Sequence, residues 1–353
     1  MGQIIVKERG RIDYEGIMYT PQNMAFPAAV CALKVFMGLG MRTREIHAHN
    51  MTWVGNLDYY FQVGVSTEGF GLFYHLPQHV IKHNIFDKEP LKDCLEGEGL
   101  QFRLITDPDV QFNKDTYSNG EELIEIITKH LRNNLPALIL TNENIVILAT
   151  GFTNNGKTIR GWVFMDGGDN TNKSFDPDYC QFIDNWTETT FALILIFEPK
   201  ELKDRKEICI NALKRGSAMM STVDCKLEGY GYGKALYRNW IHAIQDDRNY
   251  IGDVKERPYI DPEIWDLAER RAWVANFIGE AKKYIEDEEL EQAEVAFMEI
   301  HNKMWEINGL CSEDKVDKLK EKDIRFKIIN LIKECETLEE EAAECIKIVL
   351  SRC

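Results

Sequence analysis

Long apolar runs, paired cysteines and an excess of basic residues are all missing from this sequence. No stretch of about 18 apolar residues occurs, so no membrane-spanning helix is expected, and the opening MGQIIVKERGRIDYEG has no apolar core of the signal-peptide type. Acidic residues outnumber basic ones by 58 to 42, a net charge of -16. A field of this sign repels phosphate backbones and anionic headgroups, which argues against nucleic acid or a membrane as partner.

The nine cysteines form an odd, widely spaced set without any C-x-x-C. Such a set fits neither a disulfide framework nor a zinc ribbon. We therefore expect free thiols, a reducing cytoplasm and no cofactor. The set comprises Cys31, Cys94, Cys180, Cys209, Cys225, Cys311, Cys335, Cys345 and Cys353.

The length and texture of the chain predict two domains. At 353 residues it exceeds the size at which one core stops growing, roughly 250–300 residues. Its first part contains short β-branched or aromatic runs bounded by turn residues, which predict strands. These runs cover residues 3–7, 100–105, 136–141, 145–150, 160–165 and 191–197.

Local signals connect some of these runs. Asn155-Gly156 favours a hairpin because both residues tolerate positive φ, so 145–150 and 160–165 are predicted to be antiparallel neighbours. Ser118 with Glu121 reads as a capping box that opens a helix. We thus expect an α+β domain with an antiparallel sheet over residues 1–199.

After Pro199 the apolar residues recur at helical spacing, which predicts an all-α bundle of about five helices over residues 200–353. The stretch 264–285 carries its apolar residues near one side, and the bundle tryptophans are expected in the core. The apolar residues are Ile264, Leu267, Ala268, Ala272, Ala275, Phe277 and Ile278, and the tryptophans are Trp240, Trp265, Trp273 and Trp305.

The segment MAFPAAVCALKVFMG, residues 24–38, predicts a helix that begins near Ala25 or Phe26, because Pro27 suits a first helical turn. A nucleophilic cysteine gains most at a helix N-terminus, where unpaired N–H groups favour thiolate. Cys31 lies further in, between apolar neighbours. The pattern therefore favours a buried structural thiol, and leaves Cys31 as a weak catalytic candidate.

Three segments together resemble the landmarks of the papain-like, C39-peptidase-like family: FPAAVCALKVFMGLG, NIVILATGF and WVFMDGGDN. The similarity is to the N-terminal domain of the butirosin-biosynthesis acyltransferase type, which a helical domain follows in several bacterial proteins. It covers about residues 20–197. The resemblance implies a papain-like domain whose first helix opens with cysteine, whose strand follows a histidine, and whose next strand precedes an acidic residue.

The chain departs from that pattern at the reacting groups. Met24, Ala25 or Phe26 stands where the cysteine would be, and Asn144 or Ile145 replaces the histidine. Without a base, a thiol loses most of the advantage of a paired nucleophile. The acidic position is kept at Asp166 or Asp169, and Gln22 or Asn23 would stand near the oxyanion-donor position.

Three further segments invite functional interpretations. Glycines alternate with aromatic residues in STEGFGLFYHL, residues 66–76, which suits either a pocket lip or a buried turn. In HLPQHVIKH, His75, His79 and His83 would share one face of a helix and make a weak metal candidate. The alternating glycines of EGYGYGKALYRNW lack the spacing of a phosphate loop, and are interpreted as a connector that opens a helix at Gly233.

The sequence therefore favours a catalytically degenerate papain-like protein with a cleft for a small molecule or peptide. One alternative is an active cysteine peptidase or acyltransferase with a relocated thiol, which uses Cys31 or another cysteine together with a histidine from 75–83. Another is a helical scaffold, and a homodimer contact through the helical domain is also left open. The cleft candidates are Gln22, Asn23, Ala25, Phe70, Tyr74, Asn144, Asp166 and Asp169.

Overall fold

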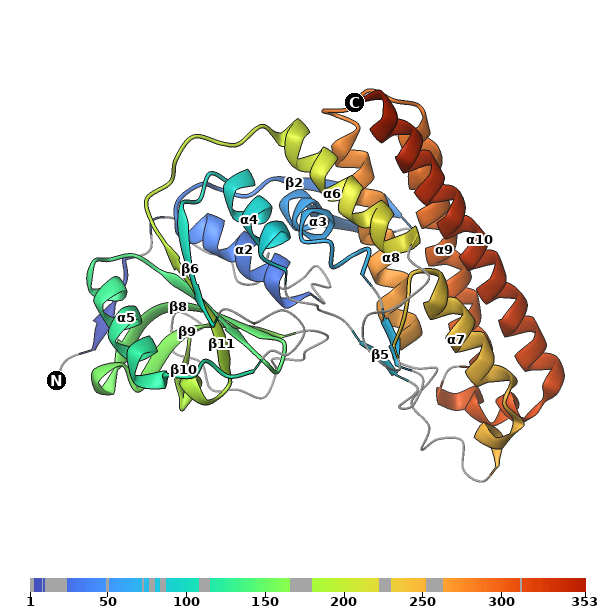
Figure 1. Cartoon of the computed structure of the whole chain (residues 1–353), viewed down its shortest axis with the longest axis horizontal. Helices are drawn as coiled ribbons and strands as arrows, with labels where there is room; N and C mark the ends of the chain where they lie inside the picture. Colours follow the sequence, from blue (N-terminus) through green and yellow to red (C-terminus); the bar gives the residue numbers. More distant parts are fainter. Residues whose placement is uncertain are drawn as a thin grey trace. The chain divides into compact units, whose positions relative to one another are not determined.

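The computed structural model divides the chain into two compact units (Figure 1). The sheet unit comprises Met1–Gln62 and Ile85–Arg205, and the helical unit comprises Val63–Asn84 and Lys206–Cys353. No helix among the described residues is both long and apolar enough to cross a membrane. The structure describes residues 3–7, 9, 24–48, 51–71, 73–75, 80–82, 87–107, 115–165, 180–221, 230–251, 263–311 and 313–353.

The sheet unit is built on a seven-stranded antiparallel sheet, which confirms the α+β expectation. Its strand order is β10-β9-β8-β7-β11-β6, and β1 pairs with β8 beyond the end of β7. The predicted runs all lie in this sheet. The strands are β1 (Ile4–Ile5), β6 (Phe102–Thr106), β7 (Ala137–Thr141), β8 (Ile145–Thr153), β9 (Thr158–Met165), β10 (Gln181–Asp184) and β11 (Thr190–Ile196).

The β8–β9 hairpin predicted from Asn155-Gly156 is confirmed. The two strands pair antiparallel from Ile145 opposite Met165 to Thr153 opposite Thr158. The short 3-10 turn η1 (Asn154–Gly156) joins them, with φ of 58° at Asn155 and 90° at Gly156. Side chains that accept this left-handed backbone are few, which is why the Asn-Gly pair was a strong signal.

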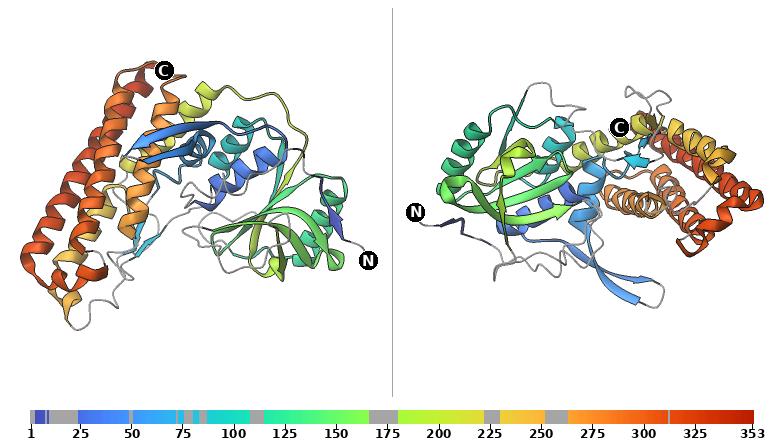
Figure 2. Two further views of the ribbon diagram at one scale, coloured as in Figure 1. Left: turned by 180° about the vertical axis from the view of Figure 1, so that it is seen from behind. Right: turned by 90° about the horizontal axis from the view of Figure 1, so that it is seen from below.

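Helices cover both faces of the sheet (Figure 2). The ring of Trp162 on β9 meets Phe36 at the end of α2 (Ala25–Phe36). Arg132 at the end of α5 (Gly120–Arg132) stacks on Phe152, which pairs with Ile159 of β9. Because Trp162 and Ile159 are three residues apart on one strand, their side chains point to opposite faces of the sheet. The helices α2 and α5 therefore cover opposite faces.

The helix starts agree with the sequence in one case and differ in the other. α2 begins at Ala25, as Pro27 predicted. α5 is capped by Asn119, whose side chain accepts from the Glu122 backbone N–H, so the prediction of Ser118 as the cap was wrong. The unit also contains α3 (Leu57–Val65), whose last residues belong to the helical unit, α4 (Lys88–Gly97), the 3-10 turn η2 (Trp186–Glu188), and a hairpin of β2 (Thr43–Ala48) and β3 (Met51–Asn56).

Five α-helices account for most of the described part of the helical unit, as the spacing predicted. α9 packs against both α8 and α10. The apolar residues predicted to share one side of the helix from 264 are buried. The helices are α6 (Arg205–Ser221), α7 (Lys234–Gln245), α8 (Glu263–Ala281), α9 (Glu289–Cys311) and α10 (Lys322–Arg352), with 3-10 turns η3 (Asp247–Tyr250) and η5 (Glu313–Lys320).

The bundle tryptophans follow the same expectation where their side chains are described. Trp240 and Trp273 are buried, and Trp305 is half-buried. The Trp265 side chain lies outside the described residues. The helix predicted to open at Gly233 does begin there, since Gly233 is the N-cap of α7.

Residues 63–84 join the helical unit, whereas a boundary at 199 was predicted. The Phe70 ring packs edge-on against Phe277 and Phe297, deep in the helical core. A Cβ on Gly64 would stand 2.0 Å from the Phe277 ring, so the close approach requires glycine there. These partners are separated by about 200 residues in sequence, and no local pattern announces them.

Strands occupy the stretch where the three histidines were placed on a helix. β4 (Phe73–His75) pairs with β5 (Val80–Lys82) and with β12 (Tyr230–Tyr232), all antiparallel. The shared helix face of His75, His79 and His83 is therefore wrong for the described part of this segment. β-branched and aromatic residues favour the pleated strand over the helix here.

Candidate functional site

The first turn of α2 is the position at which the resemblance implies a nucleophile. Ala25 is the first helical residue, and Met24 is the N-cap in extended conformation without a side-chain cap bond. Both side chains are buried, and the Met24 N–H donates to the Tyr59 hydroxyl at 3.3 Å. A methyl and a thioether stand at the helix start, and neither can attack a carbonyl.

The turn between β7 and β8 is the position at which the resemblance implies a base. Asn144 has φ of 58°, a left-handed conformation that asparagine tolerates. Its N–H donates to the Thr141 carbonyl at 3.3 Å, and the Thr141 hydroxyl bonds both backbone groups of Ile145. An amide does not titrate, so Asn144 provides no general base.

The two positions belong to neighbouring elements, because α2 packs on β8 and β9. Residues Gln22, Asn23, Asp166 and Asp169 lie outside the described residues. Ala25 and Asn144 are thus the cleft candidates that the structure describes in the sheet unit.

Cys31 has the properties of a structural thiol. It is 1% exposed in the interior of α2. Burial raises its pKa well above the ordinary value, and the carboxylates of Asp58 and Glu98 raise it further. Since the thiolate is the nucleophile, this environment argues against a catalytic role for Cys31.

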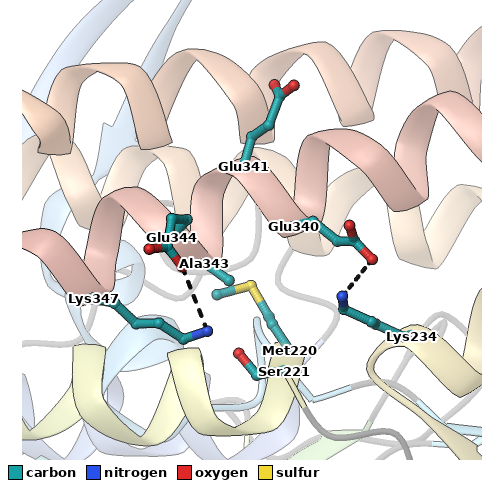
Figure 3. Close-up of a pocket in the computed structure, with 8 residues that line it drawn as sticks. All are labelled: Met220, Ser221, Lys234, Glu340, Glu341, Ala343, Glu344 and Lys347. Atoms are coloured by element: carbon teal, nitrogen blue, oxygen red, sulfur yellow. Dashed lines mark ion pairs between the residues drawn. The ribbon is translucent and has the colours of Figure 1, made fainter.

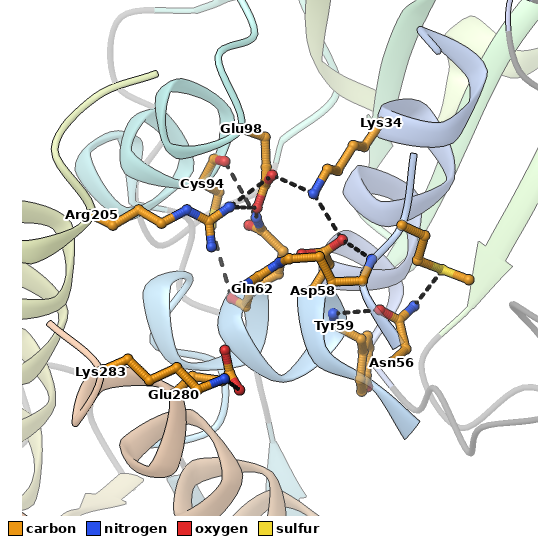
Figure 4. Close-up of polar contacts among 12 residues, drawn as sticks. Lys34, Asn56, Asp58, Tyr59, Gln62, Cys94, Glu98, Arg205, Glu280 and Lys283 are labelled. Carbon is orange, nitrogen blue, oxygen red and sulfur yellow. Dashed lines mark hydrogen bonds and ion pairs between the residues drawn. The ribbon is translucent and has the colours of Figure 1, made fainter. Parts of the chain in front are cut away.

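A buried ionic cluster lies beside this helix and includes one of its residues, Lys34 (Figure 4). Lys34, one turn after Cys31, is only 7% exposed and places its Nζ 2.8 Å from Asp58 and 2.7 Å from Glu98. Arg42 donates its backbone N–H at 2.8 Å and its Nε at 2.5 Å to Asp58. Burial alone would raise the pKa of Asp58, but the charges of Lys34 and Arg42 outweigh it, and the pKa lies below its usual value.

The second carboxylate of the cluster links further elements. Gln62 on α3 donates to Glu98 at 3.1 Å, and the Arg205 guanidinium contacts both oxygens of Glu98 at 3.2 Å. We refer to Lys34, Asp58, Glu98, Arg42 and Arg205 as the sheet-unit cluster. Each of its two carboxylates contacts two cations, which fits a structural connection of α2, α3 and α4.

The helical unit has its own buried cluster, consisting of Arg271, Glu339 and Tyr237. Arg271 donates to Glu339 through Nε at 3.1 Å and Nη2 at 2.9 Å, and to the Gly69 carbonyl through Nη1 at 2.6 Å. The Tyr237 hydroxyl also donates to Glu339. Burial, followed by the Glu339 charge, raises the pKa of Tyr237 well above its ordinary value.

Sequence reasoning missed both clusters, although a signal existed for each. Lys34 interrupts the apolar run AVCALKVF, and the residues three and four positions before and after Arg271 on its helix are all apolar. A long cation inside an apolar helical face needs a buried carboxylate. The partner could not be named, because it comes from a different element in each case.

The remaining candidates lie in the helical unit. Phe70 is a core residue and does not form a pocket lip, so the buried-turn alternative for residues 66–71 is the correct one. Tyr74 and His75 lie on β4, where the side chains are outside the described residues, as are His79 and His83. Among the residues that the structure describes, no three His, Cys, Asp or Glu side chains gather as metal ligands.

Comparison of the chain with models of known protein families gives no match. Comparison with curated proteins likewise gives no match.

Proposed function

We propose that the sheet unit is a papain-like, C39-like domain that has lost thiol catalysis and binds a small molecule or a peptide. Support comes from the order of the elements: a helix that packs on the central β8–β9 hairpin, which an acidic segment follows. The single observation that carries the proposal is the start of α2. A buried methionine N-cap and Ala25 stand there, and the nearby thiol of Cys31 is buried in the helix.

A relocated thiol enzyme is the less favoured alternative. Among the described cysteines, five besides Cys31 are buried: Cys94, Cys180, Cys209, Cys311 and Cys335. Burial, the largest cause, raises the pKa of Cys335 and of the half-buried Cys345 above the ordinary value. For Cys335 the charges of Lys303 and Arg271 act in the opposite direction but do not outweigh burial, so neither of these two environments favours a thiolate.

Mapping of thiol reactivity tests the loss of catalysis. The full chain is treated with limiting iodoacetamide at about pH 6.5, where ordinary thiols are mostly protonated, and the labelled peptides are identified by mass spectrometry. We expect exposed Cys353 to react before Cys31. Rapid and selective labelling of Cys31 would instead establish a depressed pKa and a working thiol enzyme.

Ligand-dependent stabilisation tests the binding role. The probes are short peptides with acetylated and amidated ends, and the readout is the melting temperature. A ligand at a hundred times its Kd adds about 2.7 kcal/mol to the stability of the native state. We expect at least one peptide to raise the melting temperature. A scaffold protein without a ligand site predicts no shift with any of them.

A matched pair of variants locates the effect. Asn144→Gly keeps the left-handed turn and removes the side-chain amide, so the peptide-induced shift should shrink. Asn185→Gly is the control, because Asn185 also has positive φ, is exposed and caps η2 without a side-chain bond. Equal shifts in both variants would remove Asn144 from the site.

A further inference from the structure

A cavity of about 400 Å³ lies within the helical unit, where the end of α6, the start of α7 and the middle of α10 meet (Figure 3). This volume falls in the range of small-molecule sites, roughly 300–1,000 Å³. None of the residues proposed for the cleft of the sheet unit lines this cavity. The lining residues are Met220, Ser221, Lys234, Glu340, Glu341, Ala343, Glu344 and Lys347.

Charges of both signs stand at each end of the cavity. At one end Lys234 Nζ is 2.5 Å from Glu340, and at the other end Lys347 Nζ is 3.7 Å from Glu344. The first pair is a direct contact, whereas the second is longer than a hydrogen bond. Figure 3 shows Glu341 directed away from the other side chains, which leaves one cation and one anion at each end of the cavity.

A further polar group of the cavity is the Ser221 hydroxyl. The Ser221 Oγ is buried and has no hydrogen-bond partner within the described part of the chain. A buried polar group in this state destabilises the native state, and a hydrogen-bond acceptor on a ligand would satisfy it. Figure 3 shows the Ser221 hydroxyl and Lys347 Nζ on the same side of the Met220 side chain.

We infer that this cavity binds a short zwitterionic peptide of two or three residues. Its carboxylate accepts from Ser221 and Lys347, and its ammonium donates to Glu340, whose second oxygen is directed away from the Lys234 contact. Glu340 and Lys347 are seven residues apart on α10, a rise of about 10 Å. Two or three extended residues span about 7–10 Å, which matches that separation.

Charge balance favours a zwitterion over a singly charged ligand. With Glu341 directed away, the charges of the two remaining pairs sum to zero, so a singly charged ligand would add one unpaired charge. A ligand with one charge of each sign keeps the cavity neutral and gains two charge-assisted hydrogen bonds. The lining residues belong to the helical unit, whereas Ala25 and Asn144 belong to the sheet unit. The inference therefore goes beyond the role proposed for the sheet unit and can fail without it.

Calorimetric titration of the full chain with triglycine tests the inference. N-acetyl-triglycine lacks the ammonium and triglycine amide lacks the carboxylate, so each should bind at least about tenfold more weakly than triglycine. Absence of triglycine binding, or equal affinity for the capped forms, would overturn the inference.

Variants of the lining residues assign the two ends. Lys347→Met and Ser221→Ala should each weaken triglycine binding about tenfold and leave the weak binding of triglycine amide unchanged. Glu340→Gln should weaken triglycine and leave N-acetyl-triglycine unchanged. Lys282→Met is the control, because Lys282 Nζ forms an ion pair of 2.8 Å with Glu294 that is similarly exposed. Neither residue of this pair lines the cavity. Equal affinity in all four variants would show that triglycine binds elsewhere.

Discussion

The sheet unit and the helical unit each bury an ionic cluster, but they compensate the charges differently. In the sheet unit, Asp58 and Glu98 share Lys34, and each carboxylate has an arginine besides. In the helical unit, Glu339 is the carboxylate that Arg271 contacts, and the other donor is the neutral Tyr237. The first cluster is redundant, and the second depends on one anion.

The difference teaches where a single substitution is tolerated. Removal of one member from a redundant cluster leaves the other charges partly paired. Removal of Glu339 leaves a guanidinium that is buried and faces no carboxylate in the described contacts. The burial of a charge is costly unless it is paired, so we expect the two clusters to respond unequally.

Glu339→Ala should give the largest effect. Loss of the partner of a buried arginine lowers the free energy of unfolding by about 3–5 kcal/mol. Glu336→Ala on the same helix is the control, because its partner Arg238 is 56% exposed and such a pair contributes less than about 1 kcal/mol. Hydrogen exchange of α8 and α10 peptides measures the change in the helical unit. Similar protection in both variants would contradict the dependence on Glu339.

Lys34→Met should give a smaller effect at the corresponding position of the sheet unit. Asp58 keeps Arg42 and Glu98 keeps Arg205, so we expect a loss of about 2 kcal/mol, below the usual range for a broken buried pair. Hydrogen exchange of α2 and α4 peptides provides the readout. A loss as large as that of Glu339→Ala would mean that the arginines do not compensate.

We expect the loss of unfolding free energy at low pH to originate in the sheet unit. The folded pKa of Asp58 lies below its ordinary value, mainly because Lys34 and Arg42 outweigh the burial that would raise it. Its stabilisation is therefore complete above the unfolded pKa of about 3.9 and is lost as pH falls through the folded pKa. Urea unfolding between about pH 6 and pH 2 measures this loss. Asp58→Asn should be less stable at neutral pH and should show a flatter acid limb.

We expect the loss of unfolding free energy at high pH to originate in the helical unit. Near neutral pH this effect is the smallest of those predicted here. Burial raises the folded pKa of Tyr237 above its ordinary value. The stabilisation by the neutral phenol is present below the unfolded pKa of about 10 and is lost as pH rises towards the folded pKa. Tyr237→Phe should lose part of the alkaline dependence in hydrogen exchange of α7. An unchanged alkaline limb would show that Tyr237 does not control it.

The sheet and the bundle could be predicted from sequence because their signals are local. The turn pair Asn155-Gly156 specified the β8–β9 hairpin, and the period of apolar residues from Ile264 specified α8. The start of α2 at Ala25 was also predicted correctly.

The rest depended on contacts between residues that are distant in sequence. The spacing of His75, His79 and His83 has meaning only on a helix, and pairing of β4 with β12 favours a strand instead. β12 lies about 150 residues later, so nothing near His75 announces it. The partners of Lys34 and Arg271 were hidden for the same reason, since each comes from another element.

The discontinuous helical unit has a consequence for synthesis on the ribosome. Residues 63–84 emerge early, but Phe70 packs against Phe277 and Phe297, which follow about 200 residues later. At 5–20 residues per second, this segment waits roughly 10–40 s for its partners. During that interval an aromatic segment that is buried in the folded protein stays exposed to solvent. The nascent chain should therefore depend on chaperones over this window, and a slower translation rate would lengthen it.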